Sequence, residues 1–170
     1  MKIVRKWSAA LVLGCLLAAV PAGAQSSATS DQQFLKSAGE SALAALEFSS
    51  AVKDRTPKVA VRAYAESVIA QNHLIRQRLQ HLASEAGVTL ATDLNPQQQN
   101  TERQLNQTAP AQLDTQYSRL MASQDEATIH LFRQEADSGA SARIKEFARD
   151  TLPELQALLT QARQIEDASK

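Results

Sequence analysis

Residues 111–139, AQLDTQYSRLMASQDEATIHLFRQEADSG, decide the fold, because they read as one long amphipathic helix. Their large apolar residues recur at steps of three and four, which places them on one helix face: Leu113, Tyr117, Leu120, Met121, Leu131 and Phe132. Gln124 and Thr128 fall within that stripe and Asp125 lies at its edge, where a plain core helix would carry leucine or alanine. The stretch therefore predicts a buried helix with polar residues on its inner face.

The same periodicity occurs three more times along the chain. It predicts further helices over residues 31–54, 58–86 and 141–168. Asp31 is a good N-cap residue for the first of these helices. Gly87 ends the second in the manner of a C-terminal glycine.

The links between these helices differ in length, and the difference selects a topology. The turns at 55–57 and 138–140 are short, so each joins two antiparallel neighbours. Residues 88–110 form a long polar link with a short predicted helix at 97–107. A link of that length could extend roughly 70 Å, enough to return along a helix of about 42 Å. The sequence therefore predicts an all-α domain over 31–168, a four-helix bundle of ferritin-like type with a long crossover between helices two and three.

The N-terminus has the three parts of a secretory signal. A basic head precedes an apolar run at 8–20 and the small residues Ala22-Gly23-Ala24. We expect residues 1–24 to be a signal peptide cleaved after Ala24, followed by a flexible leader at 25–30, which predicts a periplasmic or secreted protein. Cys15 allows an alternative, because Val12-Leu13-Gly14-Cys15 loosely resembles a lipobox that would anchor a lipoprotein. The apolar sequence that continues to Val20 argues against it.

The composition of the cleaved chain excludes several classes of function. Three of the 18 basic residues lie in the signal, so the remainder is mildly acidic. Without a basic stripe we expect no nucleic-acid partner. We also expect no transmembrane helix after cleavage, and without cysteine neither a disulfide nor a thiolate nucleophile. No Gly-x-Ser-x-Gly motif is present, so no catalytic residue is predicted.

From Asp31 to Ile165 the chain resembles a known family. The similar stretches are 31–35 (DQQFL), 61–65 (VRAYA), 131–136 (LFRQEA), 138–139 (SG) and 151–155 (TLPEL). They are similar to exported bacterial proteins of domain-of-unknown-function family 4142. The resemblance implies a ferritin-like bundle and export, and it implies no established reaction.

The resemblance also implies where inward Glu and His residues would stand, and this sequence departs from it there. The corresponding positions are Ala45, Asn72, Asp125 and Leu158. Alanine and leucine have no donor atom, and asparagine is a poor ligand for transition metals. A carboxylate-bridged di-metal site also needs Glu-x-x-His pairs, which the cleaved chain lacks. We therefore expect no metal and no cofactor.

The central polar residues Asn72, Gln124, Asp125 and Thr128 have two interpretations. They form a small ligand-binding pocket, or they form a buried hydrogen-bond network that fixes the register of the helices. Burying such groups unpaired would cost about 1–3 kcal/mol each, so they should bond to one another or to water. The missing metal ligands favour the network.

Three functional hypotheses follow. The first is a non-catalytic protein of the periplasm or cell envelope with a structural or stress-associated role. The second is a small-ligand-binding module that uses the central polar pocket. The third is a ferritin-like metal-binding oxidoreductase, which requires metal ligands that this sequence lacks at the corresponding positions. The sequence suggests an association with the cell envelope, but it identifies no individual partner.

Overall fold

The computed structural model describes the backbone of residues 22–168 and the side chains of residues 30–168. This part of the chain forms five α-helices and no strand: α1 (Ala22–Lys53), α2 (Val59–Glu85), α3 (Pro96–Gln107), α4 (Pro110–Ser138) and α5 (Ala142–Asp167). The all-α prediction is confirmed. The signal features through residue 21, including Cys15, lie outside the described residues.

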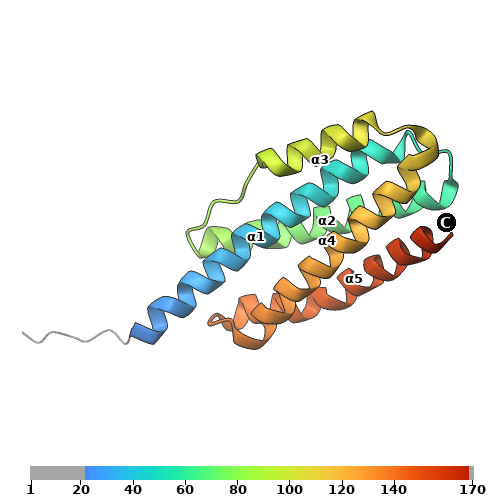
Figure 1. Ribbon diagram of the computed structural model, residues 1–170. Coiled ribbons are helices and arrows are strands. Elements are labelled where there is room, and N and C mark those ends of the chain that lie inside the picture. The colour runs from blue at the N-terminus through green and yellow to red at the C-terminus, as the bar shows by residue number, and fades with distance from the viewer. Residues whose placement is uncertain (1–21, 169–170) are drawn as a thin grey trace, which may run out of the picture.

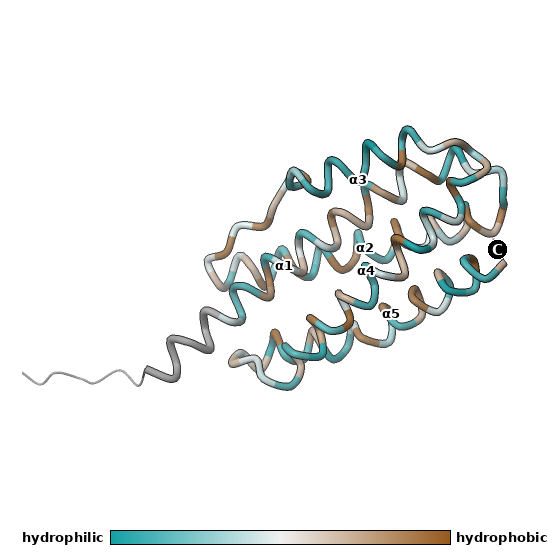
Figure 2. Tube along the Cα trace, viewed as in Figure 1, coloured by the Kyte–Doolittle hydropathy of each residue, from teal (hydrophilic) through white to brown (hydrophobic). Residues whose placement is uncertain are grey.

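The four long helices pack around a common core, and α3 lies outside it (Figure 1). The α1–α2 and α4–α5 pairs each pack side by side. In addition α1 packs on α4, and α2 packs on α5. The short helix α3 runs along the bundle against α1 and α4 (Figure 1). It is largely hydrophilic along its length (Figure 2), and Leu105 is the residue by which it reaches the core.

The helix α3 begins where the sequence predicts it, in the long link. Pro96 stands in its first turn, where proline's missing N–H costs no hydrogen bond. Asn95 and Gln98 form a capping box: Asn95 Oδ1 accepts from the Gln98 N–H at 2.9 Å, and Gln98 Oε1 accepts from the Asn95 N–H at 3.0 Å. These two bonds satisfy donors that a helix start leaves unpaired.

The first helix begins earlier than predicted. Residues 25–30, expected as a flexible leader, belong to α1, and Asp31 lies inside the helix rather than at its N-cap. The Asp31 carboxylate instead accepts hydrogen bonds from the N–H groups of Ala140 and Ser141, each at 2.8 Å. Asp31 therefore caps the start of α5, whose N-cap residue Ser141 makes no side-chain cap of its own.

The core consists of two apolar clusters stacked along the bundle. We call the first the phenylalanine cluster, after Phe34, Phe132 and Phe147, whose rings meet at centroid distances of 5.0 to 6.4 Å. We call the second the tyrosine cluster, after Tyr64 and Tyr117, whose ring centroids are 5.8 Å apart. Both clusters draw on α1, α2, α4 and α5, so either one alone ties the whole bundle together.

The inner face of α4 is rotated by about one position from the predicted stripe. Asp125, expected at the edge, is only 5% exposed, whereas Gln124 and Thr128 are half-buried. Ser118 and Ala122 are also buried. Small residues let the neighbouring helices approach closely, so the packed face follows them as well as the large apolar residues.

Candidate functional site

A small polar cavity lies where the two apolar clusters meet, and we call it the core cavity. All four predicted site residues line it: Asn72, Gln124, Asp125 and Thr128. Around them stand alanines of α1 and larger apolar residues of the other helices: Ala38, Ala42, Ala45, Ile75, Phe132 and Leu155, with Ser41 beside them. The cavity volume is about 10 Å³. That is close to the space of a single water molecule.

Asn72 and Gln124 both line this cavity, but they differ in their hydrogen bonding. Asn72 is 5% exposed, and its Nδ2 donates to the Val68 carbonyl of its own helix at 2.9 Å. Gln124 Oε1 is buried and has no hydrogen-bond partner within the described residues. A buried carbonyl oxygen of this kind usually bonds to protein or to an ordered water. The Gln124 side chain is thus the group best placed to hold a water in the cavity.

Asp125 is the acidic residue that lines the core cavity, and its pKa is strongly perturbed. Burial raises the pKa of its carboxyl to about 7, against a smaller lowering effect of the Tyr64 hydroxyl. That hydroxyl donates to Asp125 Oδ2 at 3.5 Å, a long hydrogen bond between α2 and α4. Burial, and then the charge of Asp125, raise the pKa of Tyr64 far above its ordinary range. The pair is a buried phenol beside a carboxyl that is partly protonated at neutral pH.

A second buried hydroxyl pair lies in the tyrosine cluster. Ser49 Oγ of α1 and the Tyr117 hydroxyl of α4 are 2.7 Å apart, and both residues are fully buried. The pair and the Tyr64–Asp125 bond together join α1, α2 and α4 by polar contacts. The sequence analysis did not identify this pair.

The structure brings together most of the positions at which the family resemblance implies metal ligands. Ala45, Asn72 and Asp125 line the core cavity, and Leu158 is buried nearby in the tyrosine cluster. Of these four, only Asp125 offers a good oxygen ligand to a metal ion. In the described part of the chain no three His, Cys, Asp or Glu side chains converge to hold a metal. The donor set does not fit a di-metal centre.

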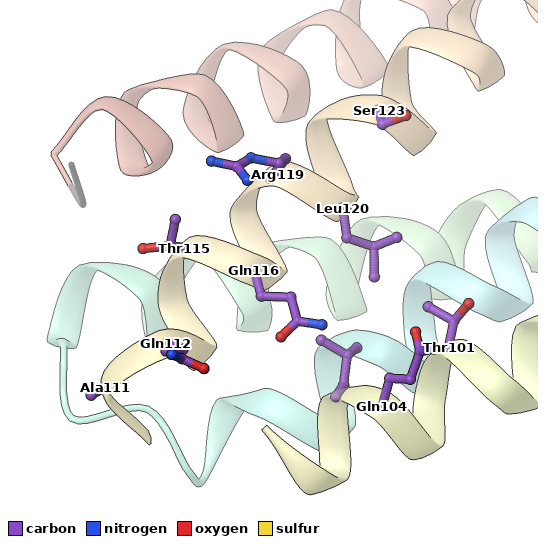
Figure 3. A pocket seen from close by; sticks show the side chains of 10 residues that line it. Thr101, Gln104, Ala111, Gln112, Thr115, Gln116, Arg119, Leu120 and Ser123 are labelled. Carbon is purple, nitrogen blue, oxygen red and sulfur yellow. The ribbon is translucent and has the colours of Figure 1, made fainter. Parts of the chain in front are cut away.

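A larger hollow lies on the outside of the bundle, and sequence reasoning did not find it. It is a groove of about 660 Å³ between α3 and α4 (Figure 3). Gln104 of α3 and Gln116 of α4 extend into it from opposite walls, and Leu120 lies deeper between the helices (Figure 3). We call it the α3–α4 groove. The one signal in the sequence was the pair Gln112 and Gln116, which share a polar face of the helix.

The three histidines lie outside the core cavity and the α3–α4 groove. His73, His81 and His130 are all exposed, and the nearest acidic partner of His81 is Glu85, 3.5 Å away on the same helix. Within the described helices no apolar run is long enough to cross a lipid bilayer.

Comparisons with known proteins agree with the fold. A family model described as Domain of unknown function (DUF4142) matches residues 17–165. A solved structure, described as the crystal structure of a DUF305 fragment from Deinococcus radiodurans, has a TM-score of 0.73 at 13% sequence identity. The match covers 82% of this chain and 96% of that one. At this identity the likeness shows the fold alone. No curated protein matches the sequence.

Proposed function

The chain belongs to the DUF4142 family, and from that membership we propose that it is an exported, non-catalytic helical bundle that acts in the cell envelope by binding. The proposal includes a ferritin-like topology. Its support is the pairing of α1 with α2 and of α4 with α5, with the long link and α3 between the two pairs (Figure 1).

The observation that carries the non-catalytic role is the state of the core cavity. Its volume of about 10 Å³ leaves no room for a substrate beside Asp125 and Tyr64. The Asn72 side chain bonds to the Val68 carbonyl of its own helix, which does not fix the register of neighbouring helices. The long Tyr64–Asp125 bond joins α2 to α4 and is the contact that supports the register-fixing interpretation. The small cavity leaves the outer surface as the place for interactions.

The two other hypotheses make stronger demands on the same residues. A small-ligand module would need the bundle to open around Asn72, Gln124 and Thr128. A metal-binding oxidoreductase would need further ligands beside Asp125, where Ala45 supplies none. The packing around the core cavity supports neither an opening of the bundle nor a second metal ligand.

Metal analysis of the purified protein tests the non-catalytic role. The full chain should be expressed with its own N-terminus, purified without chelators, and measured by mass spectrometry for iron, manganese, copper and zinc. We expect far less than one metal ion per chain, with no difference between the wild type and Asp125→Ala. Stoichiometric metal that Asp125→Ala loses would overturn the proposal.

N-terminal sequencing of the exported protein tests the compartment. We expect the protein in the periplasmic or secreted fraction with Gln25 as its first residue. A chain that begins at a lipid-modified Cys15 would move it to a membrane surface instead. An uncleaved chain in the cytoplasm would contradict export.

A further inference from the structure

We propose that the α3–α4 groove binds an extended peptide segment of neutral or acidic sequence. This inference deepens the binding role proposed above and rests on it. It is carried by the shape of the groove, by the chemistry of its walls and by the way α3 is held.

The dimensions of the groove fit a short peptide. Its α4 wall extends from Ala111 to Ser123, which corresponds to about 18 Å along a helix axis. An extended chain rises about 3.3 Å per residue, so this wall accommodates about five residues. The volume of about 660 Å³ lies in the range of sites that bind molecules of that size.

The walls offer the partners that a peptide backbone needs. Gln104, Gln112 and Gln116 carry side-chain amides with both donors and acceptors. An extended backbone presents N–H and C=O groups in alternation, so amides on two walls can pair with both kinds. Leu120, which is half-buried, supplies an apolar surface for a side chain of the peptide.

The lining of the groove offers no acidic side chain to a basic partner. No lining residue is acidic, and Arg119 is the single charged one. Its guanidinium turns away from α3 (Figure 3), and its Nε lies 3.6 Å from Glu166 Oε1. The Arg119 side chain is 67% exposed, so it can also meet an incoming carboxylate. A single cation without aromatic rings does not suit a nucleic acid, which binds through several cations and stacking surfaces.

The helix α3 is fixed at its C-terminal end, beside the groove, so the site exists before a ligand arrives. The Arg55 guanidinium donates to the carbonyl oxygens of Leu105 at 2.7 Å and Thr108 at 2.8 Å. The Thr108 hydroxyl lies 2.7 Å from Gln116 Oε1 and so joins α3 to α4. Leu105 is the buried residue of α3. A preformed site lowers the entropy cost of binding.

Fluorescence anisotropy with labelled random hexapeptide pools tests the inference on the full exported protein. One pool is built from Ala, Gln, Leu, Ser, Thr and Val, a second adds Glu, and a third adds Lys. We expect the neutral and acidic pools to bind, and the basic pool to bind at least about tenfold more weakly. A single-stranded oligothymidine should not bind.

Variants assign the binding to the groove. Gln104→Ala/Gln112→Ala removes exposed amides from both walls and should weaken binding about tenfold, because two hydrogen bonds are lost. Gln80→Ala/Gln161→Ala removes two exposed glutamines outside the groove and should leave binding unchanged. Thermal melting of both variants checks that they fold.

Three outcomes would overturn the groove as a peptide site: no pool binds at up to about 1 mM, the basic pool or oligothymidine binds best, or the two double variants behave alike. Mass spectrometry of the bound peptides separates this inference from the proposed function. Peptides recovered intact agree with a binding protein, whereas cleaved peptides would contradict the non-catalytic role while leaving the groove in place.

Discussion

Asp31 of α1 accepts a hydrogen bond from the N–H of Ser141 at the start of α5, at 2.8 Å and across 110 positions of sequence. The same carboxylate accepts from Ala140 N–H, also at 2.8 Å. One side chain therefore caps a helix that begins 110 residues further along the chain. This cap joins the first helix of the bundle to the last.

Removal of that cap should destabilise the protein. We expect Asp31→Ala to lower the free energy of unfolding by about 1–2 kcal/mol, since two N–H groups lose their acceptor. Urea denaturation measures the change. Lys36→Ala, an exposed substitution on the same helix, is the matched control and should be nearly neutral. Equal effects of the two substitutions would show that the cap contributes nothing.

Two buried acids should make the protein less stable as the pH rises toward neutrality. Burial raises the pKa of Asp125 to about 7, and burial together with the Asp31 carboxylate raises the pKa of Glu135 to about 7. Both titrate near 4 in an unfolded chain, so between about pH 4 and 7 the folded protein holds protons that the unfolded chain has released. The stability from these groups is present below that window and is lost as the pH rises through 7.

Urea denaturation at several pH values between 4.5 and 8 measures this dependence. Asp125→Asn and Glu135→Gln should each flatten the fall in stability, because each removes one titrating group. His130→Gln changes an exposed side chain and serves as the control. If both acid variants kept the slope of the wild type, the two carboxyls would not be its source.

Asn72→Leu tests the interpretation of the core cavity. The Asn72 side chain donates to a carbonyl of its own helix, and replacing it with an apolar group of similar size removes a buried polar group. We expect a change in stability of less than about 1 kcal/mol, with export and peptide binding retained. Asn72→Asp should cost several kcal/mol, because it buries an unpaired charge. A large loss of stability in Asn72→Leu would mean that the amide holds a partner the cavity needs.

Gly139 and Gly87 are required for different reasons, and two substitutions separate them. A Cβ atom at Gly139 would clash with the Glu135 side chain and also with the Glu135 backbone carbonyl oxygen. Gly87 has φ of +67° and open space around it, so its need is conformational. Gly87→Ala should cost about 1 kcal/mol of unfolding free energy.

Gly139→Ala should cost more, about 1–3 kcal/mol, because a packed side chain must move. Part of that cost should disappear when Glu135→Ala is added, whereas Glu135→Ala should give no relief to Gly87→Ala. Thermal unfolding of the three single and two double variants measures the coupling. Purely additive effects would exclude the clash with the Glu135 side chain and leave the contact with the Glu135 backbone oxygen as the cause.

The sequence predicts the helices well because their signals are local. Periodicity, Gly87 and the polar link place α2, α3, α4 and α5 within about one residue of their observed ends. The start of α1 was missed because Asp31 has the side chain of an N-cap but uses it on α5. Which backbone a carboxylate caps depends on tertiary contacts that no local pattern records.

The candidate site, too, was predicted where its signal is local and missed where it depends on tertiary contacts. Asn72, Gln124, Asp125 and Thr128 are found from sequence because polar residues interrupt an apolar stripe, and they do line one cavity. Their relative depth was not found, since it depends on close packing at small residues. The α3–α4 groove was missed altogether, because it exists only through the position that α3 takes beside α4.

The two tyrosines have one practical consequence. The single tryptophan of the chain, Trp7, lies within the proposed signal, so an exported product would keep only Tyr64 and Tyr117 as emitting side chains in the near ultraviolet. Both rings are buried, one beside Asp125 and the other beside Ser49. The unlabelled protein thus carries a built-in optical reporter of its interior, and its emission should follow the ionisation of Asp125 directly.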